Sequence, residues 1–249
     1  MLKSAIGLKE TPASIVIAID GPAASGKGTI ARRLAEVLGF DYLDTGVLYR
    51  AVGWTVLQHG RSPSIVFEAT RVAETLKLAS IDETVLRSDE VADAASKVAA
   101  IPEVRTALLD HQRHFAKNPP RGRGAVIDGR DIGTVVIPDA HVKIFVTARD
   151  EVRAHRRYLD LRPDNPDLRE GQVLSELRAR DRRDMERATA PLKPAGDAIL
   201  LETSELDIDS AVAAALAIVE RTLRQKKSAP GLQAMASGVG RPNEIQKQA

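Results

Sequence analysis

IVIAIDGPAASGKGTIARRLAEVLG, residues 15–39, is the stretch that decides the fold. It opens with a short apolar run, 15–19, which has the length and composition of a buried strand. A glycine-rich turn follows, and beyond it the apolar residues have helical spacing, with Ile30, Leu34 and Val37 on one face. Strand, glycine-rich turn and helix in this order are typical of an α/β fold.

The glycine-rich turn, GPAASGKGT, has the G-x-x-x-x-G-K pattern of a phosphate-binding loop. Its glycines let the backbone wrap an anion with N–H groups, and the start of the following helix adds a favourable dipole. A glycine-rich turn beside a surface lysine is the alternative, against which the strand before and the helix after both count. We expect the loop to bind ATP, with Lys27 at the β- and γ-phosphates. The expected ATP contacts are Gly21, Pro22, Ala23, Ala24, Ser25, Gly26, Lys27, Gly28 and Thr29.

The residue after Lys27 indicates how a metal is bound. Many nucleotide hydrolases have a Ser or Thr there that contacts Mg²⁺, whereas this chain has Gly28 and places the hydroxyl one residue later. Mg²⁺ held through water is therefore expected. No NKxD guanine-reading motif occurs downstream, which counts against a GTPase switch. The GKGT form is typical of nucleoside monophosphate kinases.

The rest of the chain alternates short apolar runs with helical patterns. Further strands are expected at residues 40–43, 125–128, 142–147 and 198–201. Helices are expected at 45–58, 150–160, 171–187 and 207–224, with other helix starts near Ser64, Ser88 and Pro102. This alternation predicts an α/β fold with a parallel sheet covered on both faces.

Composition excludes several classes of protein. Of the 249 residues 43% are apolar but only 3% aromatic, which disfavours nucleic-acid binding by base stacking. The formal charge is +2, with 36 basic and 34 acidic residues, and there is no cysteine for a disulfide, a thiolate zinc site or a nucleophile. No secretory segment or apolar run of membrane-spanning length is present. We expect a cytoplasmic protein without a nucleic-acid or membrane partner.

Four further motifs resemble bacterial cytidylate kinase: LDTGVLYR (43–50), DGRDIGTVVIPDA (128–140), KIFVTA (143–148) and RDRRDMERATAPLKPA (180–195). The resemblance covers about residues 15–224 with the motifs in order. It implies a three-layer P-loop kinase fold with a five-stranded parallel sheet, a helical monophosphate-binding insert at about 60–124 and a helical lid at about 153–182. It also implies ATP-dependent phosphorylation of CMP or dCMP. We expect a monomer, a kinase domain at 14–225, and flexible tails at 1–13 and 226–249.

Three residues in these motifs are suited to phosphate and metal chemistry. Asp128 ends an apolar strand, which would place a carboxylate near the phosphate loop to hold Mg²⁺ through water. Arg50 and Arg130 are suited to bidentate contact with a phosphate, and the resemblance places both on the α-phosphate of CMP. A helix cap for Asp128 and surface ion pairs for the arginines are the alternatives. The catalytic residues are expected to be Lys27, Asp128, Arg130 and Arg180.

The resemblance also implies the contacts with the nucleoside: Ser96, Arg105, Asp131 and Arg187 at the base, and Arg180 and Asp184 at the ribose. Residues 180, 184 and 187 have helical spacing and would share one face, an arrangement that simple ion pairs would equally use. Thr45 is expected to line the monophosphate pocket. Tyr49 is expected either to pack against the base or to be a half-buried core residue.

Residues 149–187 contain eleven arginines and ten acidic residues. A nucleic-acid surface would be one-sidedly basic, so this balance argues against one. It suits a lid that brings arginines onto the polyphosphate and excludes water. Arg153 and Arg157 are the candidates for contact with ATP. A solvated helix crossed by salt bridges is the alternative for each arginine.

The expected insert is shorter than in the family pattern, because after LKLASIDETVL (76–86) the chain passes at once to RSDEVADAASKVAA. Closure over the pocket and discrimination among pyrimidines are therefore in question. Two rival functions stay open. One is a P-loop kinase for UMP, AMP or a small metabolite; the other is a nucleotide-dependent switch that hydrolyses ATP slowly.

Overall fold

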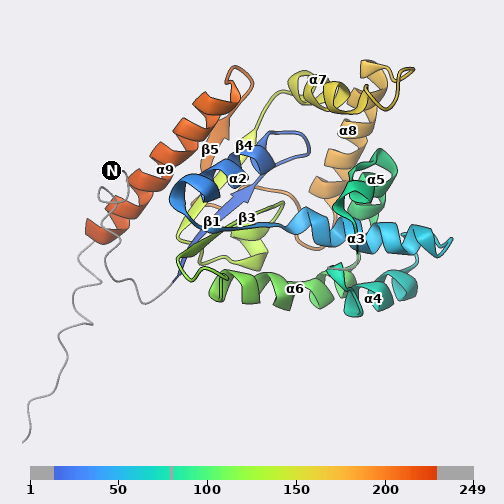
Figure 1. Cartoon of the computed structure of the whole chain (residues 1–249), viewed down its shortest axis with the longest axis horizontal. Helices are drawn as coiled ribbons and strands as arrows, with labels where there is room; N and C mark the ends of the chain where they lie inside the picture. The colour runs from blue at the N-terminus through green and yellow to red at the C-terminus, as the bar shows by residue number, and fades with distance from the viewer. Residues whose placement is uncertain (1–13, 79–80, 229–249) are drawn as a thin grey trace, which may run out of the picture.

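The computed structural model describes residues 14–78 and 81–228, in which five parallel strands form one sheet in the order β2-β3-β1-β4-β5. The strands are β1 (Ile15–Asp20), β2 (Asp41–Asp44), β3 (Gly124–Gly129), β4 (Val142–Thr147) and β5 (Ile199–Glu202). Helices cover both faces of this sheet (Figure 1). The predicted five-stranded parallel α/β fold is confirmed.

The central strands are continuous apolar runs because both of their faces are covered. All residues of β1 and β3 are buried, and β4 is buried except at its last residue. The edge strand β5 differs, since Leu201 is buried whereas Leu200 is 62% exposed.

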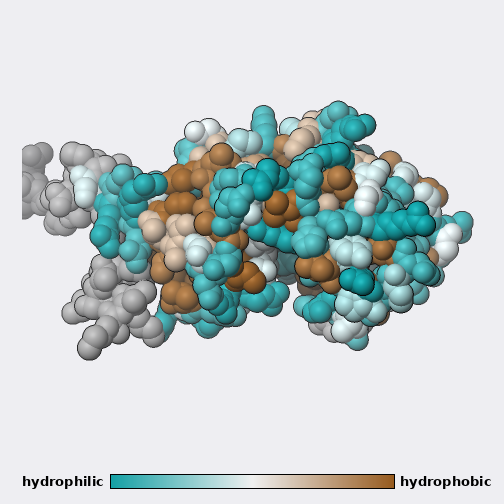
Figure 2. All heavy atoms as spheres, turned by 90° about the horizontal axis from the view of Figure 1, so that it is seen from above, coloured by the Kyte–Doolittle hydropathy of each residue, from teal (hydrophilic) through white to brown (hydrophobic). Residues whose placement is uncertain are grey.

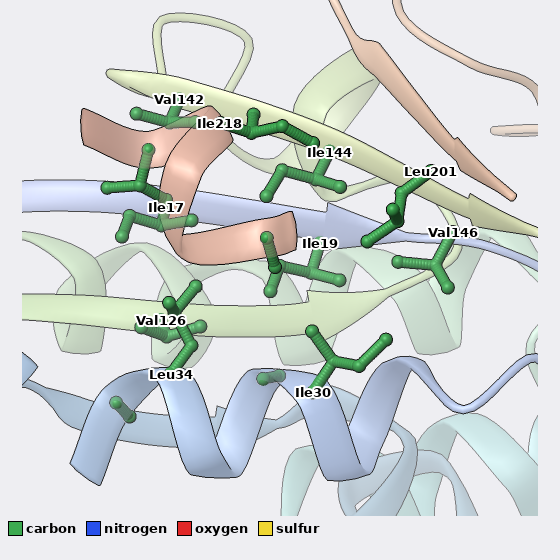
Figure 3. Packing of buried hydrophobic residues seen from close by; sticks show 14 of the residues in the cluster. Ile17, Ile19, Ile30, Leu34, Val126, Val142, Ile144, Val146, Leu201 and Ile218 are labelled. Atoms are coloured by element: carbon green, nitrogen blue, oxygen red, sulfur yellow. The ribbon is translucent and has the colours of Figure 1, made fainter. Parts of the chain in front are cut away.

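Two helices close one face of the sheet. They are α2 (Lys27–Leu38) and α9 (Ile208–Ser228), whose apolar side chains pack with Ile17, Ile19 and Val126 (Figure 3). Ile30 and Leu34 of α2 are buried as predicted, but Val37 is 49% exposed, so its assignment to this face was wrong. Leu38 packs against the core in its place in the last turn.

On the other face lie α6 (Pro102–Lys117) and the π-helical segment η3 (Ile132–Val136). The chain between β2 and β3 builds a second apolar core from α3, α4, α5 and α6. The helices not yet given bounds are α3 (Thr45–Gln58), α4 (Val66–Glu74), the short 3-10 helix η2 (Glu83–Arg87) and α5 (Asp89–Val98). A Cβ on Gly53 would lie 2.9 Å from the Cβ of Ala94, so this glycine allows α3 and α5 to cross closely.

A pair of helices, α7 (Asp150–Leu161) and α8 (Glu170–Glu186), stands beside this second core. They pack against each other, and α8 also contacts α5 (Figure 1). Seen from above, the outline of the molecule narrows between the half with α9 and the half with α3, α5 and α8 (Figure 2). The predicted helical insert is thus present, and α7 and α8 are the helices of the predicted lid region.

The predicted elements occur within a few residues of their expected bounds. The exception is α9, which runs to Ser228 instead of Arg224, so residues 226–228 are helical and not part of a flexible tail. The remaining predicted tail residues lie outside the described part of the chain. No helix among the described residues is long and apolar enough to cross a membrane.

Candidate nucleotide site

The glycine-rich loop joins β1 to α2, and its glycines are required by space and by backbone geometry. A Cβ on Gly21 would lie 2.1 Å from the carbonyl oxygen of Val146, far inside contact distance. Gly26 is the N-cap of α2, with φ 85°, in the left-handed region that favours glycine. At Gly28 the space is tight but not closed, because an added Cβ would lie 3.2 Å from Oδ2 of Asp128.

Behind the loop, neighbouring strands bring two carboxylates together. Asp44 and Asp128 are register partners at the carboxyl ends of β2 and β3. Burial, and next the charge of Asp44, raises the pKa of Asp128 to about 7. Burial, and next the charge of Arg130, lowers the pKa of Lys27 to about 8, while both carboxylates oppose that shift. Lys27, Asp44 and Asp128 therefore form one electrostatic unit at the base of the loop.

Three predicted arginines meet next to this unit. Burial and the nearby charge of Arg130 lower the pKa of Arg180 to about 10. Among the described residues, the Nε of Arg180 is buried without a hydrogen-bond partner. Arg50 pairs with Asp44 at 2.7 Å. These two residues border a cavity of about 250 Å³ that Arg32 and Arg87 also line. Because Arg180 is buried beside Arg130 and Arg50, the three positive charges lie close enough together to form a site for an anion.

A second group of predicted residues surrounds Asp131. The guanidinium of Arg105 donates to the Asp131 carboxylate, and Nη2 of Arg187 lies 3.5 Å from its other oxygen. Both arginines also reach the carbonyl oxygen of Ala99, at 3.4 and 3.5 Å. The Arg105 guanidinium lies over the ring of Tyr49, 5.6 Å from its centre. The group is buried, and it combines donors, acceptors and an aromatic face.

Asp184 contacts Arg130 of the first group, and its charge also acts on Asp131 of the second. Ser96 donates to its Oδ1 at 2.8 Å, and Nε of Arg130 donates to its Oδ2 at 3.2 Å. The predicted shared helix face is correct for Arg180 and Asp184. It is wrong for Arg187, because α8 ends at Glu186 and Arg187 is extended, with ψ 138°. Arg187 nevertheless joins the site, since the extended turn directs it to Asp131.

The sequence interpretation missed Asp20. It is buried at the end of β1, and the backbone N–H groups of Ile132 and Gly133 donate to its two carboxylate oxygens at 2.8 Å each. Burial raises its pKa to about 6. Asp20 thereby holds the segment that immediately follows Arg130 and Asp131. The sequence did contain a signal for Asp20, because the apolar run 15–19 ends in an aspartate, as the run before Asp128 does.

Two further side chains support the site from β2 and α3. Thr45, predicted to line the monophosphate pocket, donates its hydroxyl to the carbonyl oxygen of Asp128 at 2.7 Å. Asp44, which was not singled out, precedes α3. Burial works to raise the pKa of its carboxyl, but Arg50 and Lys27 bring it below the ordinary value. Only the strand pairing reveals that Asp44 faces Asp128.

The predicted lid arginines have protein partners. Arg153 is buried and pairs with Asp181 and Asp150, both at 2.5 Å. Arg157 pairs with Asp89 of α5 at 2.7 Å. Their direct contact with ATP stays a prediction.

Comparisons with known proteins agree on one family. The profile described as cytidylate kinase matches residues 17–221. The cytidylate kinase of Paramagnetospirillum magneticum is 59% identical over 83% of this chain and 98% of its own length. That of Methylocella silvestris is 56% identical over 83% and 94%. A solved gluconokinase from Sinorhizobium meliloti, with 13% identity, 88% and 98% coverage and a TM-score of 0.47, is too distant to add to this.

The coverage also bears on the insert, which the sequence predicts to be shorter than in the family pattern. The Paramagnetospirillum relative is covered to 98% within 206 aligned residues, which leaves no room in it for a long additional section. The short insert is therefore shared with this relative and is not peculiar to this chain. From the profile match and the identity to relatives covered over nearly their full length, the chain belongs to the cytidylate kinase family.

Proposed function

We propose that this chain transfers the γ-phosphoryl group of ATP to CMP or dCMP, giving ADP and CDP or dCDP. The observation that carries the proposal is the adjacency of two groups of side chains. Arg130 and Arg180 form an anion site, and Asp184 connects it to the buried group around Asp131. One group fits a phosphate and the other fits a base, as a nucleoside monophosphate requires.

The glycine-rich loop is the proposed donor site. Its backbone N–H groups and Lys27 are suited to the β- and γ-phosphates. At neutral pH a pKa of about 8 leaves Lys27 largely protonated, so it carries the charge that phosphoryl transfer needs. The loop therefore supplies shape and positive charge, and no nucleophile.

Arg50, Arg130 and Arg180 are proposed to fix the acceptor phosphate and to neutralise charge as the phosphoryl group passes in line between the nucleotides. Guanidinium groups suit this work because they contact phosphate oxygens in pairs. The attacking atom is an oxygen of the acceptor phosphate, which is already anionic near neutral pH. The protein therefore needs no general base.

The residues at the base of the loop fit Mg²⁺, a cation that prefers oxygen ligands and keeps several waters. Among residues 14–78 and 81–228 no group of three or more His, Cys, Asp or Glu side chains could hold a metal ion. A metal carried mainly by nucleotide phosphates and water agrees with this. Asp128 would hold it through water, with Asp44 beside it. When bound, Mg²⁺ neutralises phosphate charge and orients the polyphosphate.

The Asp131 group is complementary to cytosine. Cytosine presents an amino donor at N4, where uracil presents an acceptor oxygen. The Asp131 carboxylate can accept from that amino group, whereas it would face the uracil oxygen with like charge. Arg105 and Arg187 supply donors for the ring acceptors of cytosine, and Tyr49 lies beside them. CMP and dCMP are therefore the favoured acceptors over UMP, and the match to the cytidylate kinase family favours them over AMP.

We propose that the enzyme acts as a monomer. The nucleotide substrates agree with a cytoplasmic enzyme that has no nucleic-acid partner.

The test is steady-state kinetics with ATP and each of CMP, dCMP, UMP and AMP, with ATP alone as the control. ADP formation that requires an acceptor and is fastest with CMP or dCMP is expected. Faster turnover of AMP than of CMP would contradict the cytidylate assignment. ADP formation at the same rate without any acceptor would support the nucleotide switch instead.

A further inference from the structure

We infer that Arg153 and Asp181 are a positioning pair, which holds the phosphate loop at Ala23 so that the pair acts on ATP through the loop. The inference rests on the proposed donor site and adds to it. It reassigns Arg153, which the sequence places among the residues that touch ATP. It also gives Asp181, so far without a role, a place in donor binding.

The hydrogen bonds of Arg153 leave little of its guanidinium for a ligand. Its Nε donates to the carbonyl oxygen of Ala148 at 3.0 Å, and Nη1 donates to that of Ala23 at 3.0 Å. Nη1 also donates to Asp181 and Nη2 to Asp150, each at 2.5 Å. The side chain is only 4% exposed. An arginine so engaged is bound within the protein, and reaching a phosphate would break several charge-assisted bonds.

Ala23 is held on both sides by this pair. Its carbonyl oxygen accepts from Arg153, and its N–H donates to Oδ1 of Asp181 at 3.4 Å. The next residue, Ala24, has φ 56°, a left-handed conformation that alanine adopts only when its surroundings enforce it. The pair therefore acts at the point where the loop departs most from ordinary backbone geometry.

A second attachment from the same helix supports the interpretation. Arg156 of α7 donates to the carbonyl oxygen of Thr203 at 2.7 Å and lies 3.2 Å from its hydroxyl. That hydroxyl has one proton to share between the carbonyl oxygens of Ser25 and Thr147, each at 3.1 Å. Thus α7 reaches the loop twice, directly at Ala23 and through Thr203 at Ser25. The helix pair and the loop are one connected unit.

The two roles for Arg153 predict opposite effects of Asp181→Asn. If Arg153 were a phosphate ligand, removal of its partner's charge would free the guanidinium and remove a nearby negative charge, so that ATP would bind more tightly. If the pair positions the loop, the same change loosens Ala23, and ATP binds more weakly. The carboxylate of Asp181 has no attraction for a phosphate, so its loss cannot weaken binding by removing a direct contact.

The experiment is calorimetric titration of the full chain with a non-hydrolysable ATP analogue and, separately, with CMP. We expect Asp181→Asn and Arg153→Lys each to weaken binding of the analogue about tenfold, with the affinity for CMP within about twofold of wild type. The double variant should be no weaker than either single one, because one interaction is lost in all three. Glu205→Gln is the matched control, because Glu205 pairs with Arg149 nearby but is exposed. It should change neither affinity.

Thr203→Val tests the second attachment without leaving a charge unpaired in the interior. It is therefore the replacement test if the ion-pair variants do not fold. We expect it to weaken binding of the analogue about threefold and to spare CMP. Tighter or unchanged binding of the analogue by Asp181→Asn would overturn the inference, as would an equal loss for CMP. Failure of wild type itself to bind the analogue would instead remove the proposed function.

Discussion

The donor loop and the acceptor pocket of this chain are built in different ways. The loop consists of nine consecutive residues, 21–29, and is proposed to bind through backbone shape and one lysine. The acceptor pocket consists of side chains from four separate segments: α3, the α5–α6 region, the turn after β3 and the end of α8. Apart from Lys27, the loop should therefore tolerate changes of side-chain chemistry but no added volume, whereas the pocket should show the opposite sensitivity.

The largest effect is expected from Gly21→Ala. The new Cβ would lie 2.1 Å from the carbonyl oxygen of Val146, so either the loop or β4 must move. We expect the free energy of unfolding to fall by about 4 kcal/mol or more, with loss of ATP binding. Gly171→Ala in α8 is the control, since nothing lies within 4 Å of its added Cβ. Chemical denaturation measures both. A Gly21→Ala protein of wild-type stability would contradict the volume argument.

Arg130→Lys tests the chemistry of the pocket without removing charge. Lysine cannot contact Asp184 and two phosphate oxygens together, as the planar guanidinium can. We expect kcat/KM for CMP to fall about 100- to 1,000-fold, a range typical of losing one charge-stabilising donor. The stability in urea should stay close to that of wild type. Retention of full activity would show that any positive charge suffices at this position.

Arg187→Ala separates the two regions most clearly. Arg187 lies in the Asp131 group, away from the glycine-rich loop, so only acceptor binding should change. We expect KM for CMP to rise about 10- to 100-fold, the cost of losing charge-assisted hydrogen bonds. KM for ATP should stay within about twofold. Equal loss for both nucleotides would remove Arg187 from base recognition.

Asp20→Asn should have the smallest effect on activity. The amide accepts one fewer of the two N–H bonds from Ile132 and Gly133, so KM for CMP should rise about fivefold. The wild-type carboxyl has its pKa raised from 3.8 to about 6. The stability that it contributes is therefore fully present below about pH 4 and is lost as the pH rises through 6.

The Asp20→Asn variant has no titrating group at this position, so the stability difference, wild type minus variant, should shrink from pH 4 to pH 7. Denaturation at a series of pH values measures this difference. A difference that does not depend on pH would show that Asp20 has an ordinary pKa.

The contrast between loop and pocket also explains what could be read from the sequence. Strands, helices and the loop follow from local patterns of glycines and apolar residues, and these predictions were confirmed. The prediction that Val37 lies on the buried face of α2 was wrong, because Leu38 makes the apolar contact where the helix ends. The π-helical segment η3 was missed because its geometry depends on Asp20, 112 residues away. Local periodicity carries no information about such a contact.

The site was predicted unevenly for the same reason. A family resemblance supplied the pocket residues, and the structure pairs Ser96 with Asp184 and Arg105 with Asp131. The resemblance could not reveal Asp44, because only the pairing of β2 with β3 places this residue opposite Asp128. Nor could it show that Arg153 is paired with Asp181, because an ion pair between α7 and α8 is a tertiary contact.

The most direct test of the central claim, that the Asp131 group selects cytosine, is a competition. CMP, UMP and AMP are mixed at equal concentration with limiting γ-labelled ATP, and the labelled products are separated. The product ratio then gives the ratio of kcat/KM values directly. Labelled CDP should exceed both UDP and ADP by about tenfold or more, since the like-charge contact opposes uracil and the family match favours CMP over AMP. Labelled UDP or ADP equal to or above CDP would contradict the account.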